Sequence, residues 1–310
     1  MRKIVVLAIA LVANFVGFAQ EDTEEAVKSN VQEFTPSKLL NKGQWDIKFF
    51  NSLYTQTEAT NEKSESQKIA RQNFFTNTTE IYTGVSDNSR INVGLIFQIR
   101  SNNYGGQSPL SVFDFDNNLT DSRSGLTTVA PSIRVQPFAS IPNFSFTSSV
   151  YFAIFKDEAF PGQFNDPAYL DKKSTFWETK FFYDKTFGGG DWQVFTEADF
   201  GFNFGEKGAD ADFNNSNVGE RFANNSLFLP VSAFLSYFPS SKSTIFTNVQ
   251  QAFLIDLGND FSQNYTQLGL GGKYQLTEAL NLEASFGKIV RGNNFQGLGQ
   301  TFSLGLRALF

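Results

Sequence analysis

The sequence of 310 residues contains no cysteine and no histidine. Without cysteine the chain can form no disulfide, no thiolate nucleophile, no CxxC site and no lipid-modified N-terminal cysteine. Without histidine it lacks the commonest general base and the commonest zinc ligand, so Ser-His-Asp catalysis is excluded. We therefore expect a protein that is not an enzyme and that holds no cofactor and no metal.

Basic residues and long apolar runs are also scarce. The chain has 25 Lys and Arg against 31 Asp and Glu, which gives a net charge of -6. This acidic balance argues against nucleic acid as a partner. After the N-terminal region, no apolar run approaches the roughly 20 residues of a membrane-spanning helix. The mean hydropathy of -0.25 is that of a soluble protein, yet the chain has 37 phenylalanines. This contrast suggests that apolar and polar residues alternate.

The N-terminus has the pattern of a secretory signal peptide. Arg2 and Lys3 precede an apolar run over 4–16, and Gly17 and Ala19 place small residues where a signal peptidase reads them. The run is short for a membrane anchor, the alternative interpretation. We predict a signal peptide over 1–19, a polar and flexible periplasmic segment over 20–42, and one folded domain over 43–310.

Apolar and polar residues alternate through most of the mature chain. At the C-terminus one face carries Phe302, Leu304, Leu306, Ala308 and Phe310, and the other carries Thr301, Ser303, Gly305 and Arg307. Because successive side chains of a strand point to opposite faces, this pattern predicts strands with one apolar and one polar face. The same alternation marks about twelve ranges: 44–56, 72–85, 90–101, 125–137, 142–156, 174–186, 190–205, 224–238, 241–257, 262–276, 279–291 and 298–310.

The lengths of strands and connections favour a membrane barrel over a soluble sandwich. The predicted strands are long, while soluble strands mostly have about 5–6 residues. Connections after even-numbered strands are short, and most of those after odd-numbered strands are long, namely 57–71, 102–124, 157–173 and 206–223. We predict an all-β protein, a transmembrane antiparallel up-and-down β-barrel with both termini on the periplasmic side. An aromatic girdle is expected there, formed by Trp45, Phe144, Trp192, Tyr237, Tyr274 and Phe310.

The end of the chain, Leu304-Gly-Leu-Arg-Ala-Leu-Phe310, and the alternating strands resemble bacterial outer-membrane β-barrel proteins of the porin or transporter type. The Phe-, Asn- and Gly-rich composition and the Phe18-Ala19-Gln20 cleavage region resemble barrels of the Bacteroidota. The resemblance implies a place in the cell outer membrane, in contact with its lipid. It also implies recognition by the barrel-assembly machinery through the C-terminal strand ending at Phe310.

Ionisable residues on the polar faces are candidates for the lining of the lumen. They are Asp46, Lys48, Glu80, Arg100, Arg134, Glu178, Lys180, Asp184, Glu197, Asp199, Lys273, Glu283 and Arg307. They could line a pore that selects solutes by charge, or pair across neighbouring strands in a closed interior. Inward rings, Phe155, Phe182, Phe195, Phe228 and Phe234, could fill the interior or form an apolar path.

Two functions follow from these alternatives. The first is a channel or transporter for small solutes. The second is a closed scaffold whose long loops bind a partner, a ligand or a surface. Two loops carry a DxDxN spacing, at 114–118 and 210–214, which resembles the start of a calcium loop. Leu119 and Asn215 stand where that loop needs glycine, so solvated acidic loops fit better.

Overall fold

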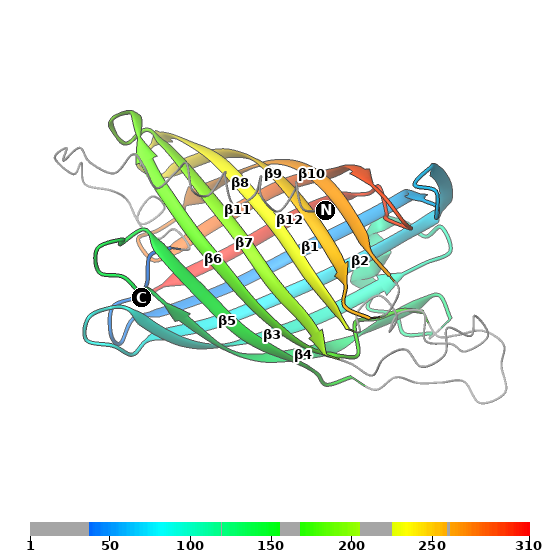
Figure 1. Ribbon diagram of the computed structural model, residues 1–310, viewed down its shortest axis with the longest axis horizontal. Coiled ribbons are helices and arrows are strands. Elements are labelled where there is room, and N and C mark those ends of the chain that lie inside the picture. The colour runs from blue at the N-terminus through cyan, green and yellow to red at the C-terminus, as the bar shows by residue number, and fades with distance from the viewer. Residues whose placement is uncertain (1–36, 119, 156–167, 205–224, 259–260) are drawn as a thin grey trace.

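The computed structural model describes residues 37–118, 120–155, 168–204, 225–258 and 261–310 (Figure 1). In this part of the chain twelve strands form one closed antiparallel barrel, each strand paired with its neighbours in sequence and β1 paired with β12. The strands are β1 (Trp45–Thr60), β2 (Ser66–Gly84), β3 (Ile91–Asn103), β4 (Ser122–Val135), β5 (Phe144–Ala153), β6 (Thr175–Phe187), β7 (Trp192–Phe204), β8 (Ser226–Ser240), β9 (Ser243–Asp256), β10 (Gln263–Gln275), β11 (Leu280–Gly292) and β12 (Gln300–Leu309). The predicted fold class is confirmed.

Helical structure in the described residues is limited to short turns of 3-10 helix, η2 (Pro109–Asp114) and η3 (Gly188–Gly190). None of the helices found there has the length and apolar character needed to cross a membrane. The predicted signal peptide over 1–19 and the loop residues Asp210, Asp212 and Asn214 lie outside the described residues.

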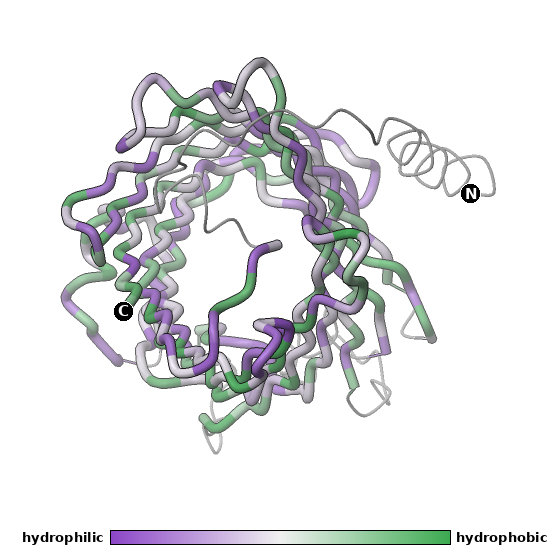
Figure 2. The backbone as a smooth tube through the Cα atoms, turned by 90° about the vertical axis from the view of Figure 1, so that its left-hand side faces the viewer, coloured by the Kyte–Doolittle hydropathy of each residue, from purple (hydrophilic) through white to green (hydrophobic). Residues whose placement is uncertain are grey.

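Strand register separates an inner and an outer face. Lys48 lies opposite Glu80 on β2 and Arg307 on β12, so these three side chains share the inner face. Large apolar side chains at the alternate positions lie exposed on the outer face, among them Leu95, Ile245, Leu268, Leu270, Phe302 and Leu304. An outer wall of this kind is stable only against an apolar surrounding. Figure 2 shows the ring of strands end on.

The connection between β1 and β2 differs from the prediction. The loop expected over 57–71 is wrong, because β1 continues to Thr60 and β2 begins at Ser66. Glu58 pairs in register with Lys68, and Ala59 with Gln67. Both faces of this hairpin end are polar, so the apolar alternation that marks the other strands is missing. Backbone pairing and hydrogen bonds between polar side chains, such as Gln56 to Gln72 at 2.7 Å, extend the hairpin, with a turn at residues 61–65.

The short-turn end of the barrel carries exposed aromatic rings. Trp45, Trp192, Tyr237, Tyr274 and Phe310 are each between 38% and 64% exposed. The rings of Trp192 and Tyr237 meet at 4.8 Å between centroids. The amide of Trp45 also donates to the carbonyl of Phe310 at 2.6 Å, which joins the two chain ends of the barrel. Rings with an apolar body and a polar tip favour a membrane interface.

The outer wall also has a polar patch that the alternation did not reveal. Asn77 donates to the side chain of Asn51 at 3.0 Å, and Asn51 donates to the carbonyl of Leu304 at 3.3 Å. Nearby, η2 lies against the outer wall, where the Phe75 and Phe113 rings meet at 5.1 Å. These mutual hydrogen bonds satisfy polar groups that would otherwise be costly on an apolar surface.

Candidate functional site: the charged lumen

The barrel encloses a cavity of about 630 Å³. Ten of the predicted lumen residues line it: Lys48, Glu80, Arg100, Arg134, Glu178, Lys180, Glu197, Lys273, Glu283 and Arg307. The other three, Asp46, Asp184 and Asp199, lie on the inner face by register but are buried beneath their neighbours. Phe182, Phe195, Phe228 and Phe234 also line the cavity, together with Phe50, Phe176, Phe238 and Phe246, which the prediction did not name.

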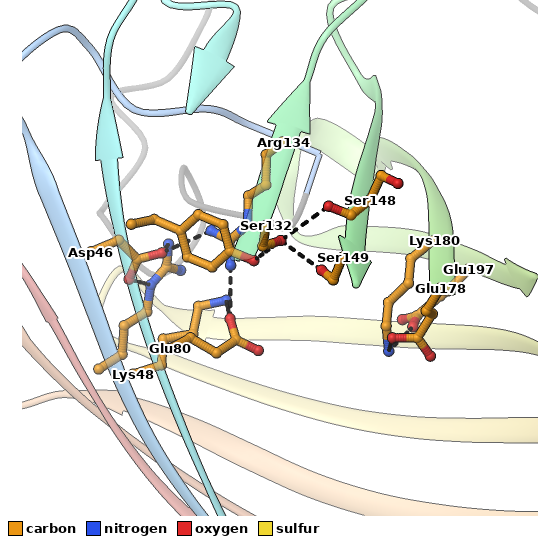
Figure 3. A network of polar contacts seen from close by, with 12 residues as sticks. Asp46, Lys48, Glu80, Ser132, Arg134, Ser148, Ser149, Glu178, Lys180 and Glu197 are labelled. Carbon is orange, nitrogen blue, oxygen red and sulfur yellow. Dashed lines mark hydrogen bonds and ion pairs between the residues drawn. The ribbon is translucent and has the colours of Figure 1, made fainter. Parts of the chain in front are cut away.

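A five-residue charge cluster joins β1, β2, β4 and β12 near the short-turn end (Figure 3). Asp46 is fully buried and accepts two hydrogen bonds from Arg307, at 2.7 Å from Nε and 2.9 Å from Nη2. Arg134 bridges Asp46 at 3.2 Å and Glu80 at 2.7 Å, and its guanidinium lies 3.4 Å from the centre of the Tyr82 ring. Lys48 approaches Glu80 at 3.3 Å. The cluster therefore links β12 and β1, the two strands that close the barrel, to β2 and β4.

A second cluster lies on β6 and β7. The ammonium of Lys180 lies 3.4 Å from Glu178, 3.5 Å from Asp199 and 3.8 Å from Glu197. Tyr151 donates to Glu178 at 3.2 Å. One cation therefore faces three carboxylates. By contrast, Lys273 and Glu283 on β10 and β11 form a one-to-one pair at 3.1 Å.

Residues 168–174, which we call the inner loop segment, fold into the lumen from the connection between β5 and β6. Asp171 pairs with Arg100 at 2.8 Å and accepts a hydrogen bond from Thr128 at 3.2 Å. Asn102 donates to the carbonyls of Tyr169 and Leu170 at 2.9 and 2.8 Å. The segment narrows the long-loop end of the lumen.

Burial changes the pKa values of this segment. It lowers the pKa of Lys172 to about 8, an effect that the carboxylate of Asp171 partly offsets. It raises the pKa of Tyr169 above the usual range, and the negative charge of Asp171 adds to the rise. The ammonium of Lys172 lies 3.7 Å from the centre of the Phe176 ring and 3.3 Å from the side-chain oxygen of Asn203. Lys172 thus remains mostly charged at neutral pH.

The opposite end of the lumen holds residues 37–44, which we call the entry segment. Leu40 packs against Tyr82 and Leu309, both on the inner face. The side chain of Asn92 accepts from the Leu40 amide at 3.1 Å and donates to its carbonyl at 3.3 Å. Lys38 reaches the cavity lining. Of the segment predicted over 20–42, residues 37–40 therefore lie along the inside of the barrel, and Lys42 is exposed and pairs with Asp87 in the turn between β2 and β3.

The contact at Asn92 gives a prediction for the entry segment. Asn92→Leu removes both hydrogen bonds to Leu40 and leaves its buried amide and carbonyl without partners, at a cost of about 1–3 kcal/mol. We expect trypsin to cleave the folded protein after Lys38 or Lys42 about 5- to 150-fold faster, since local opening sets the rate. The control is Asn248→Leu on β9. Equal cleavage of both variants would contradict the role of Asn92.

A glycine provides an independent test of the same contact. A β-carbon at Gly84 would lie 2.1 Å from the carbonyl oxygen of Asn41. Gly84→Ala must therefore displace the entry segment, and we expect faster cleavage at Lys38 or Lys42, as for Asn92→Leu. Gly272→Ala, whose nearest neighbour would lie at 3.1 Å, serves as the control.

Both lumen segments escaped the sequence analysis. The inner loop segment lacks alternation, and Asn102 and Arg123, which donate to its backbone carbonyls, fall within the predicted connection 102–124. A buried asparagine next to an apolar residue, as with Asn92 and Leu40, has no periodic signature. At 114–118, the side chain of Asn118 accepts from the amides of residues 120–122. In the part of the chain that is described, no group of three or more acidic residues is arranged to hold a metal ion.

Solved structures show the same architecture. An outer membrane channel from Pseudomonas putida F1 matches with a TM-score of 0.62 and 11% identity, over 93% of this chain and 100% of that one. The β domain of the Bordetella autotransporter Brka matches with a TM-score of 0.55 and 12% identity, over 86% of this chain and 99% of that one. The fold is that of an outer-membrane β-barrel. No protein-family model and no curated protein matches the sequence.

Proposed function

We propose that this protein is a channel in the bacterial outer membrane through which small solutes pass. The observation that carries the proposal is the cavity of about 630 Å³ inside a closed barrel, lined by charged and aromatic side chains. Mixed charge wets a lumen and gives a solute alternative polar contacts, while the apolar outer wall suits lipid. The passage requires no covalent step, and we propose no enzymatic activity.

The proposal includes an orientation and an assembly route. One end of the barrel carries the short connections and the first and last residues of the barrel. The exposed aromatic residues lie at the same end, namely Trp45, Trp192, Tyr237, Tyr274 and Phe310. We assign this end to the periplasm, because outer-membrane barrels have short periplasmic turns. The C-terminal strand ending at Phe310 would be read by the barrel-assembly machinery. The Phe-rich composition fits an origin in the Bacteroidota.

A second candidate function rests on a specific observation. The entry segment and the inner loop segment occupy the two ends of the lumen, and ion pairs link its walls. These features would suit a closed scaffold whose outer loops bind a partner.

Planar bilayers separate the two functions. We expect the refolded mature chain to give stable, stepwise single-channel currents. Deletion of residues 20–43 should increase the conductance, because the entry segment occupies part of the lumen. The control is heat-dependent mobility in gels, which reports a folded barrel. Folded protein that carries no current with or without residues 20–43 would favour the scaffold.

A further inference from the structure

The carboxylates around Lys180 exceed the positive charge available to them. Glu178 and Glu197 contribute two negative charges against the one positive charge of the Lys180 ammonium, at 3.4 and 3.8 Å, and the acidic side chain of Asp199 lies 3.5 Å from the same ammonium. None of these distances is that of a tight, hydrogen-bonded ion pair. Figure 3 shows the carboxylates of Glu178 and Glu197 together beside the Lys180 ammonium.

Asp199 places a further unsatisfied polar atom beside these carboxylates. Its side chain is 7% exposed, and its Oδ1 atom is buried without a hydrogen-bond partner. A buried acidic oxygen left in this state is costly unless a hydrogen-bond donor or a cation reaches it. Basic neighbours are engaged elsewhere, since Arg134 bridges Asp46 and Glu80, and Lys172 contacts Asn203.

An arc of phenylalanine rings begins beside these carboxylates. Phe182 and Phe195 meet at 5.9 Å, Phe195 and Phe234 at 5.4 Å, and Phe234 and Phe246 at 6.0 Å. Phe182 is two residues from Lys180 on β6, and Phe195 is two residues from Glu197 on β7. Residues two apart on a strand share a face and lie roughly 7 Å from each other. The cavity therefore offers negative charge and aromatic surface side by side.

We propose that this part of the lumen binds small organic cations that carry an ammonium group on an apolar body. The ammonium would contact Glu178 and Glu197 at the cavity surface. The apolar body would lie on Phe182, Phe195 and Phe234. The aromatic faces attract cations as well. A bare metal ion would leave the arc unused.

This inference names a solute class for the proposed channel, but binding does not depend on passage. The test is isothermal titration calorimetry on the folded mature chain in detergent, with 2-phenylethylammonium as the probe. We expect saturable binding that is at least about tenfold tighter than that of neutral 2-phenylethanol or anionic phenylacetate, because a charge-assisted contact is lost with either.

Three variants locate the site. Glu178→Gln combined with Glu197→Gln should weaken 2-phenylethylammonium binding at least about tenfold. Phe234→Ala should weaken 2-phenylethylammonium while leaving methylammonium binding unchanged, since methylammonium has no apolar body to place on the arc. Glu62→Gln, in the exposed turn between β1 and β2, is the matched control and should change neither.

The outcomes separate this inference from the channel itself. Saturable binding without any bilayer current would support the cation site and contradict the channel. Current together with equal binding of 2-phenylethylammonium, 2-phenylethanol and phenylacetate would contradict the cation site alone. Binding that survives the double substitution unchanged would also overturn the site.

Discussion

Asp46→Asn is expected to lower the free energy of unfolding by about 3–5 kcal/mol, the cost of removing one partner from a buried ion pair. Asp46 is fully buried and holds Arg307 through two hydrogen bonds and Arg134 through a third. Asparagine keeps the shape of the side chain but loses its charge. Arg307 would then lack the carboxylate it pairs with at 2.7 Å, and Arg134 would keep only Glu80.

The position of Asp46 makes the expected effect large. β1 is the strand that closes the barrel against β12, and Asp46 lies opposite Leu309 on β12 and opposite Tyr82 on β2. Loss of the cluster would therefore weaken the closing seam as well as one charge pair. The measurement is urea unfolding of the refolded protein in detergent micelles, followed by tryptophan fluorescence.

The matched control is Asp87→Asn. Asp87 pairs with Lys42 at 2.7 Å, but the two side chains are 89% and 61% exposed. Exposed ion pairs contribute about 0–1 kcal/mol, so we expect a change below about 1 kcal/mol. Similar destabilisation by the two substitutions would refute the special role of Asp46.

Leu270→Arg is expected to destabilise the protein in lipid bilayers by about 2–4 kcal/mol, the cost of a basic residue near the midplane of a barrel wall. Leu270 lies in the middle of β10, on the outer face, and is 61% exposed. If lipid covers this face, the guanidinium must leave water. The measurement is the equilibrium of unfolding from lipid vesicles.

The control for Leu270 lies on the same strand and the opposite face. Gln267 pairs in register with Gln250 on β9 and faces the lumen. Gln267→Arg adds the same charge on the wet side of the wall, and we expect a smaller cost. An equal cost for the two variants would contradict the assignment of the outer face to lipid.

An element could be predicted from the sequence where its two faces meet different surroundings. Strands such as β12 have strict alternation because one face meets an apolar surrounding and the other meets polar groups. That alternation places the charged positions on the inner face. The prediction of a loop at the hairpin end of β1 and β2 was wrong. Both faces of these residues are polar, so they show no alternation, and the pairing of their backbones leaves no trace in composition.

The sequence likewise predicted some features of the candidate site and not others. Alternation identified Asp46, Lys180 and Glu197 as inner-face residues, since each lies on the polar face of its predicted strand. It could not show that Asp46 holds two arginines while Lys180 faces three carboxylates. That difference depends on which positions of neighbouring strands lie opposite each other, and a slip of one residue would change it.

The sequence alone predicts the compartment, the all-β class, the number of strands and the two faces of the barrel wall. Each of these depends on local composition and on an alternation with a period of two. The occupation of the lumen by the entry and inner loop segments depends on contacts such as Leu40 with Asn92 and Asp171 with Arg100. These contacts join residues 52 and 71 positions apart. Contacts at such separations leave no periodic trace in the sequence, so the folded arrangement decides which charges pair and how much of the lumen remains open.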